Sequence, residues 1–220
     1  MSAQPYYSDA LVTIYHGDSR EIVPQVDSLD VSMLLTDPPY GLSVVQSDGS
    51  VNGASSTIRH RPVVGDDQPF DPRPWLIYPK VILWGANHFA HHLPASTGWL
   101  VWDKREQTPS NWMSDAEMAW CSFKTPVRIF RHYWNGPVRA SERGNHLHPT
   151  QKPVALMRWT LEQFTQPGDL ILDPFMGSGP IAQACSETGR RYIGIELDEA
   201  YCAAAVQRLA QQTLDFGGVA

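Results

Sequence analysis

Cysteine, charged side chains and long apolar runs are all scarce in this sequence. Three of its 220 residues are cysteines, Cys121, Cys185 and Cys202, and their spacing fits neither a disulfide framework nor a structural zinc site. No apolar run approaches the roughly 20 residues of a membrane span. The first residues also lack the basic and apolar segments of a secretory signal. We therefore expect a cytoplasmic protein with reduced, buried cysteines and no membrane partner.

The composition is that of a globular chain, with 42% hydrophobic residues and a mean hydropathy of -0.30, so we expect one domain over residues 1–220. The formal net charge is -6, but residues 121–160 hold seven basic residues against one acidic residue. Such a segment can attract a phosphate backbone, although a solvated basic face explains it as well. The cluster of His88, His91 and His92 has no carboxylate or cysteine at ligand spacing, so we expect no metal site.

Strand and helix patterns alternate along the chain. Apolar runs predict strands at 31–36, 81–84, 99–102, 117–123 and 127–134. Residues 43–74 carry four prolines and no apolar period, which predicts a long flexible loop. From residue 154 an apolar stripe predicts a helix to 164, followed by strands at 170–172 and 191–196 and by helices that begin at Pro180 and after Asp198. This alternation favours an α/β fold with parallel strands.

A glycine-containing turn follows the strand at 170–172. In the sequence AspProPheMetGlySerGly, Gly177 and Gly179 let a ligand approach the backbone, and Glu196 at the end of the next strand can accept two ribose hydroxyls. Asp173 before the turn would repel a pyrophosphate, so the turn suits a cationic amino-acid tail better. A tight structural turn is the alternative reading.

A second motif, AspProProTyr, ends the strand at 31–36. The prolines restrict the residues before them, so the carboxylate of Asp37 and the carbonyl of Pro38 can accept the two hydrogens of one amino group, and the ring of Tyr40 can stack on the base that carries it. A strand-terminating turn is the alternative reading.

The third motif is HisProThrGlnLysPro at 148–153. Thr150 can cap the helix from 154, and its free N–H groups together with Lys152 can bind a carboxylate. An ordinary helix N-terminus, with a capping threonine and an exposed lysine but no ligand, explains the same residues.

In this order the three motifs resemble those of the DNA N6-adenine and N4-cytosine amino-methyltransferases, permuted β group. The resemblance runs from about His16 to Leu209, and Gly17–Asp18 also resembles the segment near the cofactor's adenine. It implies a Rossmann-like fold with a mostly parallel, twisted, seven-stranded sheet, helices on both faces and inserted DNA-binding loops. It also implies S-adenosylmethionine as methyl donor, held by these residues: Asp18, Thr150, Lys152, Asp173, Phe175, Gly177, Gly179 and Glu196.

The resemblance further implies a catalytic motif of Asp37, Pro38, Pro39 and Tyr40, with 43–74 as a loop beside it and 103–148 as target-recognition insertions. The expected product is N6-methyladenine in DNA, because the AspProProTyr motif is typical of the adenine-specific enzymes in this group. An N4-cytosine enzyme or a non-enzymatic DNA-binding descendant is the alternative. A homodimer and a companion restriction endonuclease are left open. The expected phosphate contacts are Lys124, Arg128, Arg131, Arg139 and Arg143.

Overall fold

The protein is described from a computed structural model, which covers residues 3–26, 30–43, 63–110, 114–135, 138–142 and 151–216. Two compact units make up the chain. The first, unit 1, combines 1–36 with 151–220, and the second, unit 2, is the continuous segment 37–150.

Unit 1 contains five strands of a mostly parallel sheet. In spatial order these are β1 (Tyr7–Ser8), β2 (Val12–His16), β11 (Arg191–Glu196), β10 (Leu170–Asp173) and β3 (Met33–Thr36). The pairings of β2 with β11, β11 with β10 and β10 with β3 are parallel, and β1 pairs antiparallel with β2. All residues of β3 and β10 are buried, as continuous apolar runs in parallel sheets normally are.

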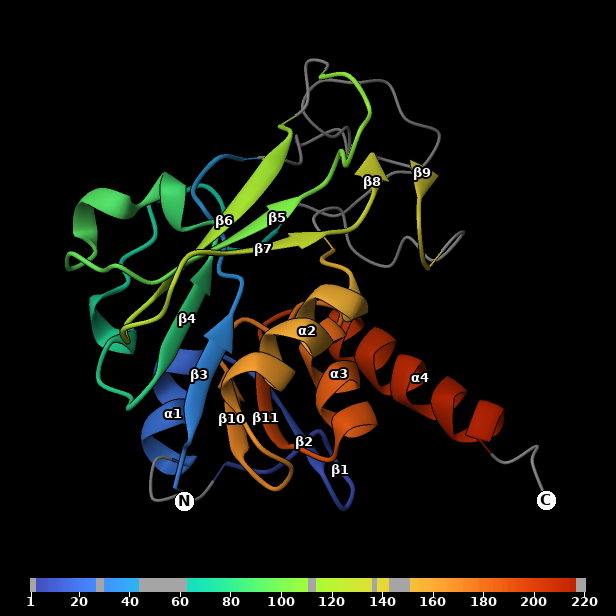
Figure 1. The fold of residues 1–220 in the computed structure, drawn as a ribbon. Coiled ribbons are helices and arrows are strands. Elements are labelled where there is room, and N and C mark those ends of the chain that lie inside the picture. Colours follow the sequence, from blue (N-terminus) through green and yellow to red (C-terminus); the bar gives the residue numbers. More distant parts are fainter. Residues whose placement is uncertain are drawn as a thin grey trace. The chain divides into compact units, whose positions relative to one another are not determined.

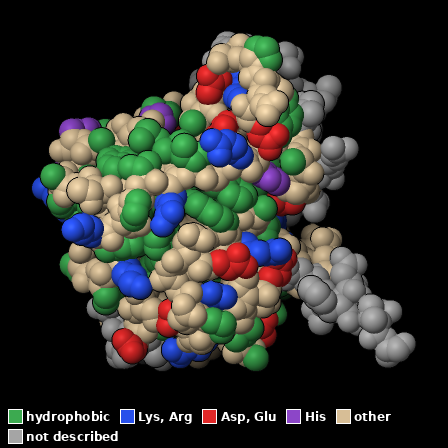
Figure 2. Space-filling model, in the orientation of Figure 1, with side chains coloured by type: hydrophobic (Ala, Val, Ile, Leu, Met, Phe, Trp, Pro, Cys, Tyr) green, Lys and Arg blue, Asp and Glu red, His purple; other side chains and the backbone are tan. Residues whose placement is uncertain are grey.

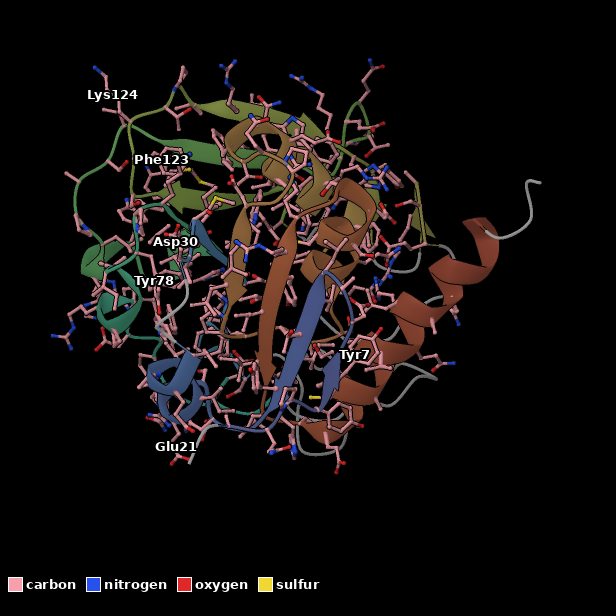
Figure 3. All side chains as sticks on the ribbon, turned by 90° about the horizontal axis from the view of Figure 1, so that it is seen from below. Tyr7, Glu21, Asp30, Tyr78, Phe123 and Lys124 are labelled. Carbon is pink, nitrogen blue, oxygen red and sulfur yellow. The ribbon has the colours of Figure 1, made fainter. Side chains whose placement is uncertain are left out.

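Helices cover both faces of the unit 1 strands. The helices are α1 (Ser19–Val26), α2 (Val154–Phe164), α3 (Pro180–Thr188) and α4 (Glu199–Phe216). Figures 1 and 3 show α2 and α3 on one face of these strands and α1 on the other. On α2 the predicted stripe is buried at Val154, Met157 and Leu161. Asp198 caps α4 as predicted, since its carboxylate accepts the N–H of Ala200 at 2.9 Å.

The predicted cap of α2 is wrong. The helix begins at Val154, and its N-cap is Pro153, with no side-chain hydrogen bond to the cap. Thr150 stands three residues before that cap, outside the described residues, and a capping side chain must come from the N-cap position itself to reach the first N–H groups.

Unit 2 contains four strands, in the order β4 (Val81–Trp84), β6 (Ala116–Cys121), β5 (Trp99–Asp103) and β7 (Arg128–Arg131). Strand β6 runs antiparallel to β4 and β5, whereas β7 is parallel to β5. A separate pair joins β8 (Trp134–Asn135) to β9 (Val138–Arg139). Short 3-10 turns lie at η1 (Arg73–Trp75), η2 (Ala86–His88) and η3 (Ala90–His92).

The α/β class is confirmed, but the number of strands is not. Across the described residues unit 1 holds five of these strands and unit 2 holds four, nine in all, where seven were predicted. The two residues of β1 are too few to show an alternating pattern, which needs four or more residues. All three cysteines are free and buried, as predicted. Within the described part of the chain, no helix combines the length and apolar character needed to cross a bilayer.

A buried carboxylate joins three strands of unit 1. Asp173, 1% exposed at the end of β10, accepts the Thr36 hydroxyl of β3 at 2.6 Å and the Tyr192 hydroxyl of β11 at 2.9 Å. Burial and the charge of Asp173 raise the pKa of Tyr192 well above its usual value, so this hydroxyl stays protonated and donates at neutral pH.

We predict that Tyr192→Phe lowers the free energy of unfolding by about 1.5–3 kcal/mol, because a buried carboxylate loses a hydrogen-bond donor. Tyr7→Phe is the matched control, since Tyr7 donates to Asp9 at 2.8 Å on the exposed edge and exposed pairs contribute about 0–1 kcal/mol. Figure 3 shows Tyr7 at the margin of the unit 1 strands. Urea denaturation compares the two variants. Equal decreases in the free energy of unfolding would show that the Tyr192–Asp173 hydrogen bond contributes no more than an exposed one.

Candidate active site

The carboxyl ends of the parallel strands in unit 1 carry a row of polar side chains. In the strand register, Glu196 of β11 lies beside His16 of β2, and Asp173 of β10 lies beside Gly194 of β11. Ligands of open α/β sheets bind at this edge. The fold therefore brings the predicted cofactor residues Asp173 and Glu196 to the same edge of one unit.

The predicted glycine turn connects β10 to α3. Gly177 and Gly179 both have positive φ, at 55° and 75°, which only glycine adopts without strain. The N–H of Met176 donates to the carbonyl of Ile195 at 3.0 Å, so the turn is tied to β11. The hydroxyl of Ser178 is buried and has no hydrogen-bond partner within the described residues. A polar ligand in this turn is one explanation for an unpartnered buried hydroxyl.

Glu196 is oriented by the backbone around it. One carboxylate oxygen accepts the N–H of Gly177 and the other accepts the N–H of Asp198, both at 2.8 Å. Burial raises the pKa of Glu196, while these backbone donors act in the opposite direction. Each carboxylate oxygen has two lone pairs, so the group keeps acceptor capacity for a ligand while its position stays fixed.

The other predicted cofactor residues of unit 1 have varied surroundings. Asp173 faces hydroxyls of its own sheet, and it also accepts the N–H of Phe175 at 3.2 Å; Phe175 is half-buried. Lys152 is 3% exposed. Asp18 precedes α1, where its carboxylate accepts the N–H of Arg20 at 2.8 Å and forms an ion pair with the Arg20 guanidinium at 2.7 Å.

In unit 2 the AspProProTyr motif forms a compact group. The hydroxyl of Tyr40 donates to the carboxylate of Asp37, a contact that the sequence argument missed because it assigned Tyr40 to stacking alone. The ring of Tyr40 stacks on His88, with centroids 4.8 Å apart and planes 18° apart. The same ring lies over Gly85, where an added Cβ would come within 2.0 Å of it. Gly85 and His88 therefore hold the ring of Tyr40.

A second residue missed by the sequence argument is Asp66. Its side chain is buried at 5% exposure, and one oxygen accepts the N–H groups of Tyr40, Gly41 and Leu42 at 3.1, 3.0 and 3.2 Å. Residues 44–62 of the predicted loop lie outside the described residues. The described part of this loop, Ser43 and residues 63–74, contains buried Asp66 and buried Phe70.

The predicted phosphate contacts fall into two groups. Lys124, Arg128 and Arg131 are exposed, and Figure 3 shows Lys124 pointing away from the fold. Arg131 also lies 3.6 Å from the carboxylate of Asp103. On the face in Figure 2, basic side chains are dispersed among hydrophobic and acidic ones. Strand β7, which carries Arg128 and Arg131, also exposes Ile129.

Arg139 differs from these, because it is 5% exposed and its guanidinium lies 4.1 Å from the centroid of the Trp134 ring. This cation–π contact stabilises the β8–β9 pair and leaves little of the side chain at the surface. Arg143 lies outside the described residues.

We predict that Gly179→Ala destabilises the protein by about 2–5 kcal/mol, the sum of left-handed strain and overpacking. The added Cβ would lie 2.8 Å from the Cβ of Ala205 on α4. Gly168→Ala is the matched control: its φ is +89°, but nothing lies within 4 Å, so strain alone applies. Ala205→Gly combined with Gly179→Ala should restore the packing part. Thermal unfolding that ranks both single variants equally would contradict this packing argument.

Comparisons with known proteins agree with this geometry. A family model described as DNA methylase, N6_N4_Mtase, matches residues 95–207, just over half of the chain. The Escherichia coli (strain K12) protein YubD is 54% identical over 67 residues, a match that spans 30% of each chain. The type II methyltransferase M2.DpnII of Streptococcus pneumoniae is 25% identical over 95% of this chain and 93% of its own.

Two solved structures share the fold. The M1.HpyAVI–SAM complex superimposes with a TM-score of 0.59 at 23% identity, covering 90% of this chain and 100% of the other. The cytosine-N4-specific PvuII DNA methyltransferase gives a TM-score of 0.62 at 17% identity, covering 94% and 89%. The α/β architecture is thus the Rossmann-like one of methyltransferases, and the chain belongs to the N6/N4 DNA methylase family.

Proposed function

We propose that this chain transfers a methyl group from S-adenosylmethionine to the N6 amine of adenine in DNA. The observation that carries the proposal is the Asp37–Tyr40 hydrogen bond, with the Tyr40 ring held on His88. It combines a carboxylate acceptor with a planar aromatic surface in one motif, which is what an aromatic amine requires.

The residues of unit 1 fit S-adenosylmethionine. Glu196 offers an oriented carboxylate for the two ribose hydroxyls, and the positive φ of Gly177 and Gly179 keeps the turn free of side-chain bulk. The buried Ser178 hydroxyl supplies a further polar contact in the same turn. In this assignment Asp173, Phe175, Lys152, Thr150 and Asp18 complete the cofactor site, as the family resemblance implies. When bound, the cofactor supplies an electrophilic methyl group on a sulfonium.

The chain's own residues act on the amine. The lone pair of an exocyclic amine is delocalised into the base, so the nitrogen is a poor nucleophile. Asp37 and the carbonyl of Pro38 accept its hydrogens and draw the lone pair towards nitrogen, while Tyr40 fixes the plane of the base. As the new C–N bond forms and the S–C bond breaks, the amine releases one proton, which the Asp37 carboxylate can accept. A carboxylate has about four lone-pair sites, so the Tyr40 hydroxyl does not exhaust its capacity.

DNA is the proposed partner, with its target base flipped out of the duplex at a cost of a few kcal/mol. The exposed Lys124, Arg128 and Arg131 are the proposed phosphate contacts, and the segment 103–148 is the proposed target-recognition region. Arg139 and Arg143 complete the predicted set, although the burial of Arg139 against Trp134 favours a structural role for that residue.

We predict that Glu196→Ala weakens S-adenosylmethionine binding roughly ten- to hundredfold, because a charge-assisted hydrogen bond contributes about 1.5–3 kcal/mol. Calorimetric titration of the folded variant measures this change. Glu162→Ala, an exposed carboxylate on α2, is the control and should bind as wild type. Unchanged affinity in Glu196→Ala would remove Glu196 from the cofactor site.

We predict N6-methyladenine as the product and a loss of at least about a hundredfold in transfer for Asp37→Ala, since the amine loses its charged acceptor. Mass spectrometry of nucleosides from unmethylated DNA treated with the protein identifies the base. Asp30→Ala, an exposed carboxylate before β3, is the control and should retain activity. The PvuII relationship makes N4-methylcytosine the specific alternative, and its appearance as main product would refute the adenine assignment.

A further inference from the structure

The AspProProTyr motif at residues 37–40, called the acceptor motif from here on, is held by a carboxylate that is distant in sequence. Asp66, 26 residues after Tyr40, accepts three successive backbone N–H groups, from Tyr40, Gly41 and Leu42, on a single oxygen. Its own carbonyl accepts the N–H of Ser43 at 2.8 Å. Successive N–H groups that converge in this way form a concave anion site, and here the anion is a side chain of the protein itself.

The backbone around this anchor is closely packed at Gly41. Gly41 has a φ of +78°, and a Cβ there would lie 2.6 Å from the carbonyl oxygen of Gln68. On the other side of the motif, a Cβ on Gly65 would lie 3.7 Å from Pro39. Residues 65–68 therefore follow the backbone of the motif from Pro39 to Ser43.

Asp66 fixes the backbone of Tyr40, which the contacts of the Tyr40 ring do not fix. Gly85 and His88 hold the ring, and the hydroxyl is bound to Asp37. Asp66 holds the backbone N–H of the same residue. With its backbone, ring and hydroxyl each bound, Tyr40 has one orientation, and the entropy of ordering it is lost during folding rather than during the reaction.

We propose that Asp66 is a positioning residue of the acceptor motif, which presets the Asp37–Tyr40 pair for the incoming base by binding the backbone of residues 40–42. This inference rests on the proposed function of Asp37 and Tyr40. Asp66 acts through the backbone N–H groups of residues 40–42, none of which is a proposed cofactor residue. Its loss should therefore lower the rate of methyl transfer while S-adenosylmethionine affinity stays the same.

The test uses Asp66→Ala, Asp66→Asn and the control Asp67→Ala, a neighbouring exposed carboxylate. Amide hydrogen exchange, followed by NMR, reports directly on the anchor. In Asp66→Ala the amides of residues 40–42 should exchange at least about tenfold faster. Asp66→Asn keeps one acceptor oxygen and should be intermediate, which also covers the case in which the alanine variant does not fold. Asp67→Ala should match wild type.

The second readout is kinetic. In Asp66→Ala, kcat for DNA methylation should fall roughly ten- to hundredfold with cofactor affinity within about twofold of wild type. Unchanged exchange at residues 40–42 would overturn the anchor, and faster exchange with unchanged kcat would overturn its role in positioning. Absence of methyl transfer by the wild-type protein would instead overturn the proposed function, while the exchange measurement would still decide whether Asp66 holds the turn.

Discussion

The buried carboxylate of Asp173 is the constraint on which unit 1 depends, because it ends one central strand and binds hydroxyls from both neighbours, Thr36 of β3 and Tyr192 of β11. A charge at 1% exposure is stable only when its oxygens are hydrogen-bonded. The three strands must therefore end in register. That register places Glu196 and the glycine turn at one edge of the strands. The geometry of the candidate cofactor site therefore depends on the hydrogen bonds of Asp173.

Much of this fold is readable in the sequence, because the relevant signals are local. Strand β4 at 81–84 and strand β11 at 191–196 have the predicted bounds, since β4 is an apolar run followed by Gly85, and the buried centre of β11 lies between Arg191 and Glu196. The α2 stripe and the Asp198 cap are likewise properties of neighbouring residues. Strand β1 has only two residues and pairs through its backbone, so its sequence carries no comparable signal. The cap predicted at Thr150 failed because α2 begins only at Val154, with Pro153 as its N-cap.

The candidate site divides in the same way. The motifs at 37–40 and 173–179 were recognisable because their chemistry is contained in a few adjacent residues. Asp66 and His88 were not, since their contacts with Tyr40 depend on how distant segments pack. Backbone N–H groups are present at every residue except proline, so a carboxylate that binds them has no partner that a sequence could single out. The roles assigned to the predicted residues in binding and catalysis remain predictions.

The division of the chain into units sets an order for folding during synthesis. In unit 1, β2 at 12–16 pairs with β11 at 191–196, so its central strands cannot assemble until nearly the whole chain has left the ribosome. Unit 2 is one continuous segment, so all of its strands have been synthesised well before β11. The acceptor motif, together with Asp66, therefore belongs to the part of the chain that can form first. The edge of unit 1 that carries Asp173 and Glu196 can form only after β11 has been synthesised. In nascent chains, the edge of β2 that pairs with β11 and the edge of β3 that pairs with β10 consequently stay unpaired for most of synthesis, and such edges are prone to aggregation.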